Sequence, residues 1–399
     1  MPPVEFLLFG VTLLGVALFH RHVLAIAVSG LVTIIAYKLL ATGFDGIAGF
    51  AGLLAHMQHE WVILANLFGL LVGFALLADH FELSKIPKVL PGFLPDDWLG
   101  ALALLGIVFV MSAFLDNIAG ALIGATMAAG VFRNRVHIGY LAAIVAAANA
   151  GGAGSVLGDT TTTMMWIAGV NAIDVLHAYV ASFAAFFVFA IPASRQQQRF
   201  SPIVKDGIDT HRIDWPRLII VGFILVAAII ANVAVNRMPE TIGGSLPFLG
   251  LAVWLVLLLT AIWRKPTWSI LPSAISGSLF LLALVLCASL MPVEKLPAAS
   301  VQTTFGLGFL SAVFDNIPLT KLALDAGGYD WGFLAFAVGY GGSMIWFGSS
   351  AGVAVSNRFP EAKSVGAWLR GGWHVVLGYL VGFAAIYFVL GWQPHAPLR

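Results

Sequence analysis

The chain has 399 residues, of which 60% are hydrophobic and only 10% are charged. Soluble domains carry about a quarter of charged residues, so this composition excludes an ordinary soluble protein and indicates a polytopic membrane protein. The net charge of +1 excludes the basic footprint of a nucleic-acid-binding protein, and the single cysteine excludes a disulfide framework and a thiolate metal site.

Long apolar runs follow one another along the chain. A helix that crosses a bilayer needs about 20 predominantly apolar residues. Uninterrupted runs predict membrane spans at residues 4–19, 23–40, 61–78, 175–191, 218–235, 248–263, 270–290 and 368–392. The first run has no basic leader and no small-residue cleavage site, so we expect a retained helix rather than a signal peptide. Residues 42–60 and 79–97 are predicted connections, and residues 193–216 form the most hydrophilic loop.

Two apolar runs, residues 98–132 and 301–326, are each interrupted by an Asp-Asn pair: Asp116–Asn117 and Asp315–Asn316. An aspartate at the bilayer centre costs about 2.5–3.5 kcal/mol on insertion scales, so such a residue indicates a functional site by default. Each run has the length of two short helices. We therefore predict two helical hairpins that enter and leave the membrane on the same side, with the Asp-Asn pairs at their tips.

Two further runs, residues 137–170 and 331–356, contain paired glycines. Gly151-Gly152 precedes Gly158-Asp159-Thr160 by five residues, and Gly341-Gly342 precedes Gly348-Ser349-Ser350 by the same interval. Glycine pairs allow a helix to unwind, which predicts two broken helices, although close helix packing is the alternative reading. Hairpin and broken helix recur in the same order, so the sequence predicts two repeats, as in many secondary transporters.

The distribution of basic residues orients these elements. If the N-terminus lies outside, most of the 20 lysines and arginines fall in inside loops, provided that both interrupted runs are hairpins. Five crossings then separate the hairpins, so the second repeat is inverted relative to the first. Both termini are expected outside.

The polar residues of the four interrupted runs are suited to a small cation. Carboxylate, amide and hydroxyl oxygens are the ligands that a hard cation prefers, and a carboxylate in a partly dry site takes up a proton more readily than in water. Together these properties permit cation/proton antiport. Asp159 has no acidic counterpart, because its mirror position is Ser349, so we expect proton coupling near Asp159. Lys321 is interpreted as neutralising a nearby carboxylate rather than binding substrate.

Four sequence blocks resemble the NhaD-type sodium/proton antiporters, within a superfamily that includes arsenite exporters, citrate transporters and dicarboxylate/sodium symporters. They lie in both halves of the chain: Ala148-Asn149-Ala150-Gly151-Gly152, Gly158-Asp159-Thr160-Thr161-Thr162-Thr163-Met164, Phe314-Asp315-Asn316-Ile317-Pro318-Leu319-Thr320, and Gly341-Gly342-Ser343-Met344 with Gly348-Ser349-Ser350-Ala351-Gly352-Val353.

The resemblance implies an all-α fold of two inverted repeats, each with a re-entrant hairpin and a broken helix. It also implies a transport domain that moves against a scaffold domain, usually in a homodimer embedded in lipid, with no cofactor beyond the transported ions. Carried over by motif, the ion path would be lined by Asp116, Asn117, Asp159, Thr160, Asp315, Asn316, Ser343, Ser349 and Ser350. Two departures stand out: Ile118-Ala119-Gly120 replaces the hydroxyl residues that often follow the first Asp-Asn pair, and Lys321 follows the second.

The sequence thus predicts scaffold helices at residues 1–97 and 217–297, transport elements at residues 98–192 and 298–399, and a cytoplasmic loop at residues 193–216. The leading hypothesis is a non-enzymatic exchanger of sodium or lithium for protons in the cytoplasmic membrane of a prokaryote. An anion, carboxylate or metalloid transporter of the same fold is the alternative, and Lys321 favours it slightly. An intramembrane aspartyl protease fits poorly, because Val156 stands where that motif needs glycine.

Overall fold

The computed structural model describes residues 3–396 apart from residues 20, 45, 205–211 and 236. These residues fold into helices, with one isolated β-bridge between Phe44 and Ile47. Six helical segments of this part of the chain are long and apolar enough to cross a membrane: Val23–Thr42, Gly49–Leu83, Ala172–Phe200, Trp215–Val235, Trp268–Ser289 and Trp373–Leu390. The architecture is that of an all-helical polytopic membrane protein.

The described residues of the first half of the chain form the helices α1 to α10. They are α1 (Val4–Leu18), α2 (Val23–Tyr37) with the π-helical turn Lys38–Thr42, α3 (Gly49–Leu83), α4 (Ile86–Val89), α5 (Trp98–Ser112), α6 (Asn117–Val131), α7 (Ile138–Ala153), α8 (Thr160–Ile167), α9 (Ala172–Leu176) and α10 (Ala178–Phe200).

The described part of the second half forms the helices α11 to α20. Its helices are α11 (Trp215–Val235), α12 (Glu240–Gly243), α13 (Phe248–Thr260), α14 (Leu271–Ser289), α15 (Val301–Ser311), α16 (Asn316–Ala326), α17 (Trp331–Gly341), α18 (Ser350–Arg358), α19 (Val365–Gly371) and α20 (Trp373–Leu390). Short 3-10 turns lie at Leu90–Phe93, Trp268–Ile270, Val293–Lys295 and Pro360–Ala362.

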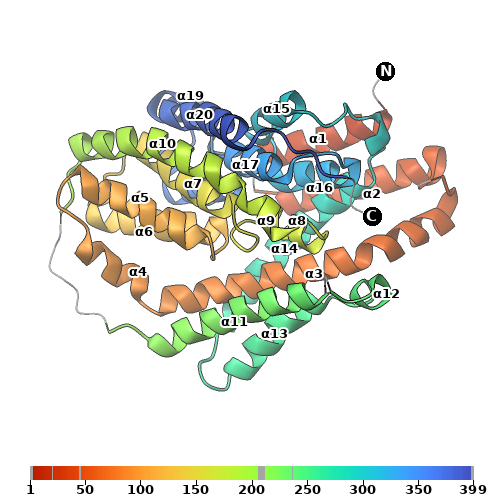
Figure 1. The fold of residues 1–399 in the computed structure, drawn as a ribbon, viewed down its shortest axis with the longest axis horizontal. Coiled ribbons are helices and arrows are strands. Elements are labelled where there is room, and N and C mark those ends of the chain that lie inside the picture. The colour runs from red at the N-terminus through yellow and green to blue at the C-terminus, as the bar shows by residue number, and fades with distance from the viewer. Residues whose placement is uncertain (1–2, 20, 45, 205–211, 236, 397–399) are drawn as a thin grey trace.

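All four predicted interruptions are present as breaks between helices. Residues 113–116 separate α5 from α6, and residues 312–315 separate α15 from α16, so each Asp-Asn pair lies at the start of the second helix. Residues 154–159 separate α7 from α8, and residues 342–349 separate α17 from α18. In Figure 1, α5 and α6 lie in the left part of the molecule and α16 in the right part, whereas the short helix α8 lies between them.

Two helix boundaries differ from the prediction. α3 begins at Gly49, so most of the predicted connection at residues 42–60 is helical. α10 continues to Phe200, so the predicted loop at residues 193–216 starts as helix, and its residues 205–211 lie outside the described part of the chain. Hydropathy marks where apolar side chains end, not where the backbone leaves the helix. In α10, for example, buried Gln197 donates to the carbonyls of Arg135 and Ser201 and thereby supports the polar extension.

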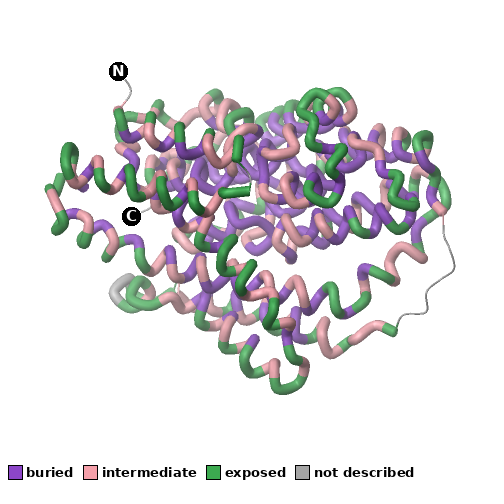
Figure 2. The backbone as a smooth tube through the Cα atoms, turned by 180° about the vertical axis from the view of Figure 1, so that it is seen from behind, coloured by how far each residue is buried: buried purple, intermediate pink, exposed green. Residues whose placement is uncertain are grey.

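The core is built around α7 and α17, the first halves of the two broken helices. All residues of α17, and all of α7 except Ile138, are buried. Figure 2 shows this buried centre as a continuous purple region. The alanines and glycines of α7 let neighbouring backbones approach closely, whereas α17 also buries large side chains such as Trp331, Phe336 and Tyr340.

The paired glycines serve this close approach and also stand at or next to the two predicted breaks, since Gly342 is the first residue of the second one. Gly151 still lies within α7, and Gly341 is the last residue of α17. A side chain at Gly151 would run into the carbonyl oxygen of Phe109 in α5, and one at Gly341 into that of Gly308 in α15. Their neighbours Gly152 and Gly342 face the carbonyls at the far side of each break, where an added Cβ would lie 2.5 Å and 2.9 Å from the oxygens of residues 158 and 348.

Candidate ion-binding site

Four helices begin at the predicted site residues. Asp116 precedes α6, Asp159 precedes α8, Asp315 precedes α16 and Ser349 precedes α18. The free amides of a helix N-terminus carry partial positive charge, which stabilises a carboxylate placed there. Each aspartate therefore has local compensation for part of its charge.

Asp159 is the most deeply buried of the three carboxylates, with 1% of its surface exposed. Its Oδ1 accepts a hydrogen bond from the Thr161 amide at 3.0 Å and lies 3.5 Å from Nδ2 of Asn316. Its Oδ2 is buried and has no hydrogen-bond partner among the described residues. One oxygen is thus fixed to the protein and the other is free to hold a proton or a cation.

Asn149 connects the two halves of the site. Its Oδ1 accepts from Nδ2 of Asn117 at 3.0 Å, and its Nδ2 donates to Oγ of Ser343 at 2.9 Å and to Oγ of Ser349 at 3.3 Å. Our sequence analysis did not assign Asn149 to the ion path. The available signal was its place as the one amide within α7, two residues before the glycine pair.

Asp315 is bound in a similar way on the other side. Its Oδ1 accepts from the Ile317 amide at 3.1 Å, and its Oδ2 accepts from Oγ of Ser350 at 3.0 Å. Asn316 reaches across to Asp159, as described above. The second Asp-Asn pair therefore contacts the first half directly through Asn316, and the first pair is linked to the second half through Asn149, which places both halves around one site.

Asp116 is half-buried, and the Thr160 side chain and the backbone amides of residues 117–119 lie close enough to interact with its carboxylate. Asp159 is close enough to both Asp116 and Asp315 for their charges to interact. A buried carboxylate beside two others of the same charge favours binding of a proton or a cation at this group. The sequence-predicted residues Asp116, Asn117, Asp159, Thr160, Asp315, Asn316, Ser343, Ser349 and Ser350 are linked, through Asn149, into one group.

The remaining threonines of the first break have structural roles. Thr162 Oγ1 donates to the Ser155 carbonyl at 2.5 Å, and Thr163 Oγ1 donates to the Val156 carbonyl at 3.1 Å. These bonds satisfy carbonyls that the unwound segment leaves without helical partners. They hold the break in shape, whereas the Thr160 side chain lies beside Asp116 and the Thr161 side chain beside Asp159.

Lys321, one turn into α16, is paired with two carboxylates outside this group. Its Nζ lies 3.0 Å from Oε1 of Glu60 in α3 and 2.8 Å from Oδ1 of Asp325. Lys321 and Glu60 side chains are each only 5% exposed. The prediction that Lys321 neutralises a nearby carboxylate is confirmed, but the carboxylates are Glu60 and Asp325, which lie outside the predicted ion path.

We expect Lys321→Met to destabilise the protein by about 3–5 kcal/mol, because it leaves buried charge without its partner. The measurement is the apparent unfolding temperature of the detergent-purified protein. Combining Lys321→Met with Glu60→Gln and Asp325→Asn should recover most of the loss, since no unpaired charge then remains. Lys295→Met, at an exposed lysine, is the control. Equal stability of Lys321→Met and the wild type would contradict this account.

Sequence comparisons agree with this geometry, although no family model matches the chain. The chain is 28% identical over 320 residues to "Sodium/proton antiporter 1" of Arabidopsis thaliana, covering 71% of this chain. It is 26% identical over 324 residues to "Sodium/proton antiporter 2" of the same plant, and 25% identical over 319 residues to "Na(+)/H(+) antiporter NhaD" of Vibrio cholerae. These alignments cover 70% and 69% of the chain.

The chain is a relative of the NhaD-type sodium/proton antiporters. The matched regions span 52% of the first plant protein, 72% of the second and 67% of the Vibrio NhaD. The chain therefore spans about half the length of the first of these antiporters and about two thirds or more of the others. The relationship supports the transporter class that the sequence and the site indicate.

Proposed function

We propose that the protein exchanges sodium or lithium for protons across the cytoplasmic membrane of a prokaryote. The observation that carries the proposal is the free, buried Oδ2 of Asp159, placed between Asp116 and Asp315 where four helices begin. The printed names of the antiporter relatives support the same function.

In this proposal protons and the cation compete for the three carboxylates, so binding of one displaces the other. Asp159 carries the exchange step, because one of its oxygens is held by the Thr161 amide and the other is unoccupied by protein. Asp116 and Asp315 supply charge from either side, and Thr160 and Ser350 supply hydroxyls. Binding of a proton lowers the negative charge at the site and so weakens binding of the cation, which is the coupling that antiport requires.

We infer that the two halves are inverted repeats with re-entrant hairpins, α5–α6 and α15–α16. The opposite placement of α6 and α16 in Figure 1 and the positive-inside charge distribution support this arrangement. The marked chain ends lie near the same end of the long axis in both views, which is compatible with both termini outside. Residues 98–192 and 298–399 would form the transport domain, residues 1–97 and 217–297 the scaffold, and the unit would be a homodimer.

The anion-transport alternative loses its main support from the pairing of Lys321. That lysine is compensated by Glu60 and Asp325, so it offers no free positive charge to a carboxylate substrate. Three aspartates remain at the site, and they would repel an anion.

The test uses the purified full chain in sealed liposomes with an imposed pH gradient and a pH-sensitive dye. Sodium, lithium and potassium are added in turn, followed by citrate and succinate. We expect sodium or lithium to dissipate the gradient in the wild type and to have no effect in Asp315→Asn. A response to citrate or succinate, without a response to any cation, would contradict the proposal.

A further inference from the structure

A cavity of about 750 Å³ connects the candidate site with one end of α3. Asp116 and Asp159 line it from the site, and Asp79 and Glu82 line it from the last two turns of α3. Ser269 and Ser273, at the start of α14, line it as well. The charge distribution places this end of α3 on the cytoplasmic side, beside Lys85 and Lys88.

The charged residues that line this cavity all have the same sign. Among the described lining residues, four are carboxylates and none is lysine, arginine or histidine. A second cavity, of about 680 Å³, is different, because Lys38, Lys295 and Lys321 line it together with acidic residues and histidines. A cleft with charges of one sign and low-dielectric walls focuses the field and raises the local concentration of counter-ions.

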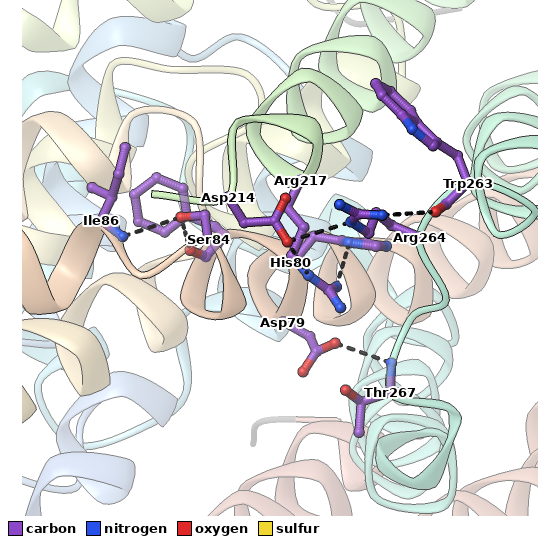
Figure 3. Close-up of polar contacts among 10 residues, drawn as sticks. Asp79, His80, Ser84, Ile86, Asp214, Arg217, Trp263, Arg264 and Thr267 are labelled. Atoms are coloured by element: carbon purple, nitrogen blue, oxygen red, sulfur yellow. Dashed lines mark hydrogen bonds and ion pairs between the residues drawn. The ribbon is translucent and has the colours of Figure 1, made fainter. Parts of the chain in front are cut away.

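Two arginines near this end of α3 are engaged elsewhere, as Figure 3 shows. Arg217 Nη1 lies 3.1 Å from Nδ1 of His80, and Arg264 Nε lies 3.4 Å from Oδ2 of Asp214. Arginine can only donate, so Nδ1 of His80 is the acceptor in this contact. Neither arginine lines the cavity. The contacts tie α3, α11 and the segment before α14 together and keep these positive charges in a separate cluster.

The two carboxylates at the mouth differ in their bonding. Asp79 accepts from the Thr267 amide at 3.1 Å, which fixes its orientation (Figure 3). Glu82 is exposed, and its side chain makes no hydrogen bond or ion pair with any other described residue. Its carboxylate is therefore available to a cation that enters from water. At the inner end of the same cavity lies the unpartnered, buried Oδ2 of Asp159.

We propose that this cavity is a cation-selective access path from the cytoplasm, and that Glu82 recruits the monovalent cation at its mouth. The inference rests on the proposed antiport and adds the path, its side and the residue that sets apparent affinity for the cation. A cation attracted by Glu82 moves along an acidic wall past Asp79 to Asp116 and Asp159. Glu82 is not a residue of the exchange step, so its charge affects arrival of the cation and not turnover.

The experiment uses everted membrane vesicles, in which added sodium reaches the cytoplasmic face. At low ionic strength we expect Glu82→Gln to raise the KM for sodium about three- to tenfold and Glu82→Lys to raise it further, with the maximal rate unchanged. At about 1 M ionic strength, set with N-methylglucamine chloride, the Debye length falls to about 3 Å and the difference should disappear. Glu361→Gln is the matched control, since Glu361 is exposed and does not line the cavity.

An unchanged KM in both Glu82 variants would overturn the inference while leaving the proposed antiport in place, provided that the wild type responds to sodium. A KM increase of the same size at high and low ionic strength would also overturn it, because it would indicate a structural effect. The absence of any cation response in the wild type would instead reject the proposed function, and the inference with it.

Discussion

Asp159→Asn is expected to reduce cation/proton exchange at least about 100-fold in proteoliposomes while leaving the fold intact. The asparagine amide does not take up or release a proton in the pH range of the assay. It also lacks the negative charge with which the carboxylate attracts a cation. The amide oxygen can still accept from the Thr161 amide, as Oδ1 of Asp159 does at 3.0 Å, so the start of α8 is retained. The measurement is sodium-dependent dissipation of a pH gradient, with elution by size exclusion as the check on folding.

Asp330→Asn is the matched control for this substitution. Asp330 is also a buried aspartate at a helix start, where it accepts from the amides of Gly332 and Phe333, but it is not linked to the candidate site. We expect Asp330→Asn to retain exchange. Exchange at the wild-type rate in Asp159→Asn would show that the proton is carried elsewhere, and loss of exchange in both variants would point to a general effect of removing a helix cap.

The second large effect is expected at Asn149. Replacement by alanine removes three hydrogen bonds at once and leaves Asn117, Ser343 and Ser349 without that partner. Each buried polar group that loses its bond costs about 1–3 kcal/mol. We expect Asn149→Ala to lower exchange per folded molecule at least about tenfold, because the first hairpin tip is no longer held to the second broken helix. Sodium-driven exchange and the apparent unfolding temperature are measured on the same preparation.

Asn66→Ala separates loss of stability from loss of the site. Asn66 is a buried asparagine in α3 whose Oδ1 accepts from the amides of Leu249 and Gly250 at the start of α13, and it does not line the cavity that Asp116 and Asp159 share. It should destabilise the protein by a similar amount and leave exchange per folded molecule unchanged. If Asn149→Ala behaves as Asn66→Ala does, then Asn149 is a packing residue and the two halves of the site are not coupled through it.

The breaks between helices could be predicted because lipid tolerates few polar groups. An Asp-Asn pair within an apolar run has no stable place except a helix end inside the protein, and α6 and α16 both begin there. Because the same pattern recurs in the second half, the sequence also predicted that the two Asp-Asn pairs belong to one site. The end of α10 lies beyond its apolar run and could not be predicted from hydropathy. Hydrogen bonds of a polar side chain, Gln197, stabilise the helix there.

The partners of individual side chains could not be predicted from the sequence. Lys321 and Glu60 are 261 positions apart, and only the packing of α16 near α3 brings them together. Asn149 looks like any isolated amide in a small-residue helix, and its role follows from three partners in other elements. The glycine pairs allowed either unwinding or close packing, and the choice depended on where Phe109 and Gly308 lie.

The central claim is that protons and the cation compete for the same carboxylates, and proton release on sodium binding tests it most directly. Sodium is titrated calorimetrically into the purified protein in two buffers with different ionisation enthalpies, which yields the number of protons released per bound ion. We predict that sodium binding releases protons in the wild type and not in Asp159→Asn. Sodium binding without proton release in the wild type, or the same release in Asp159→Asn, would contradict the account.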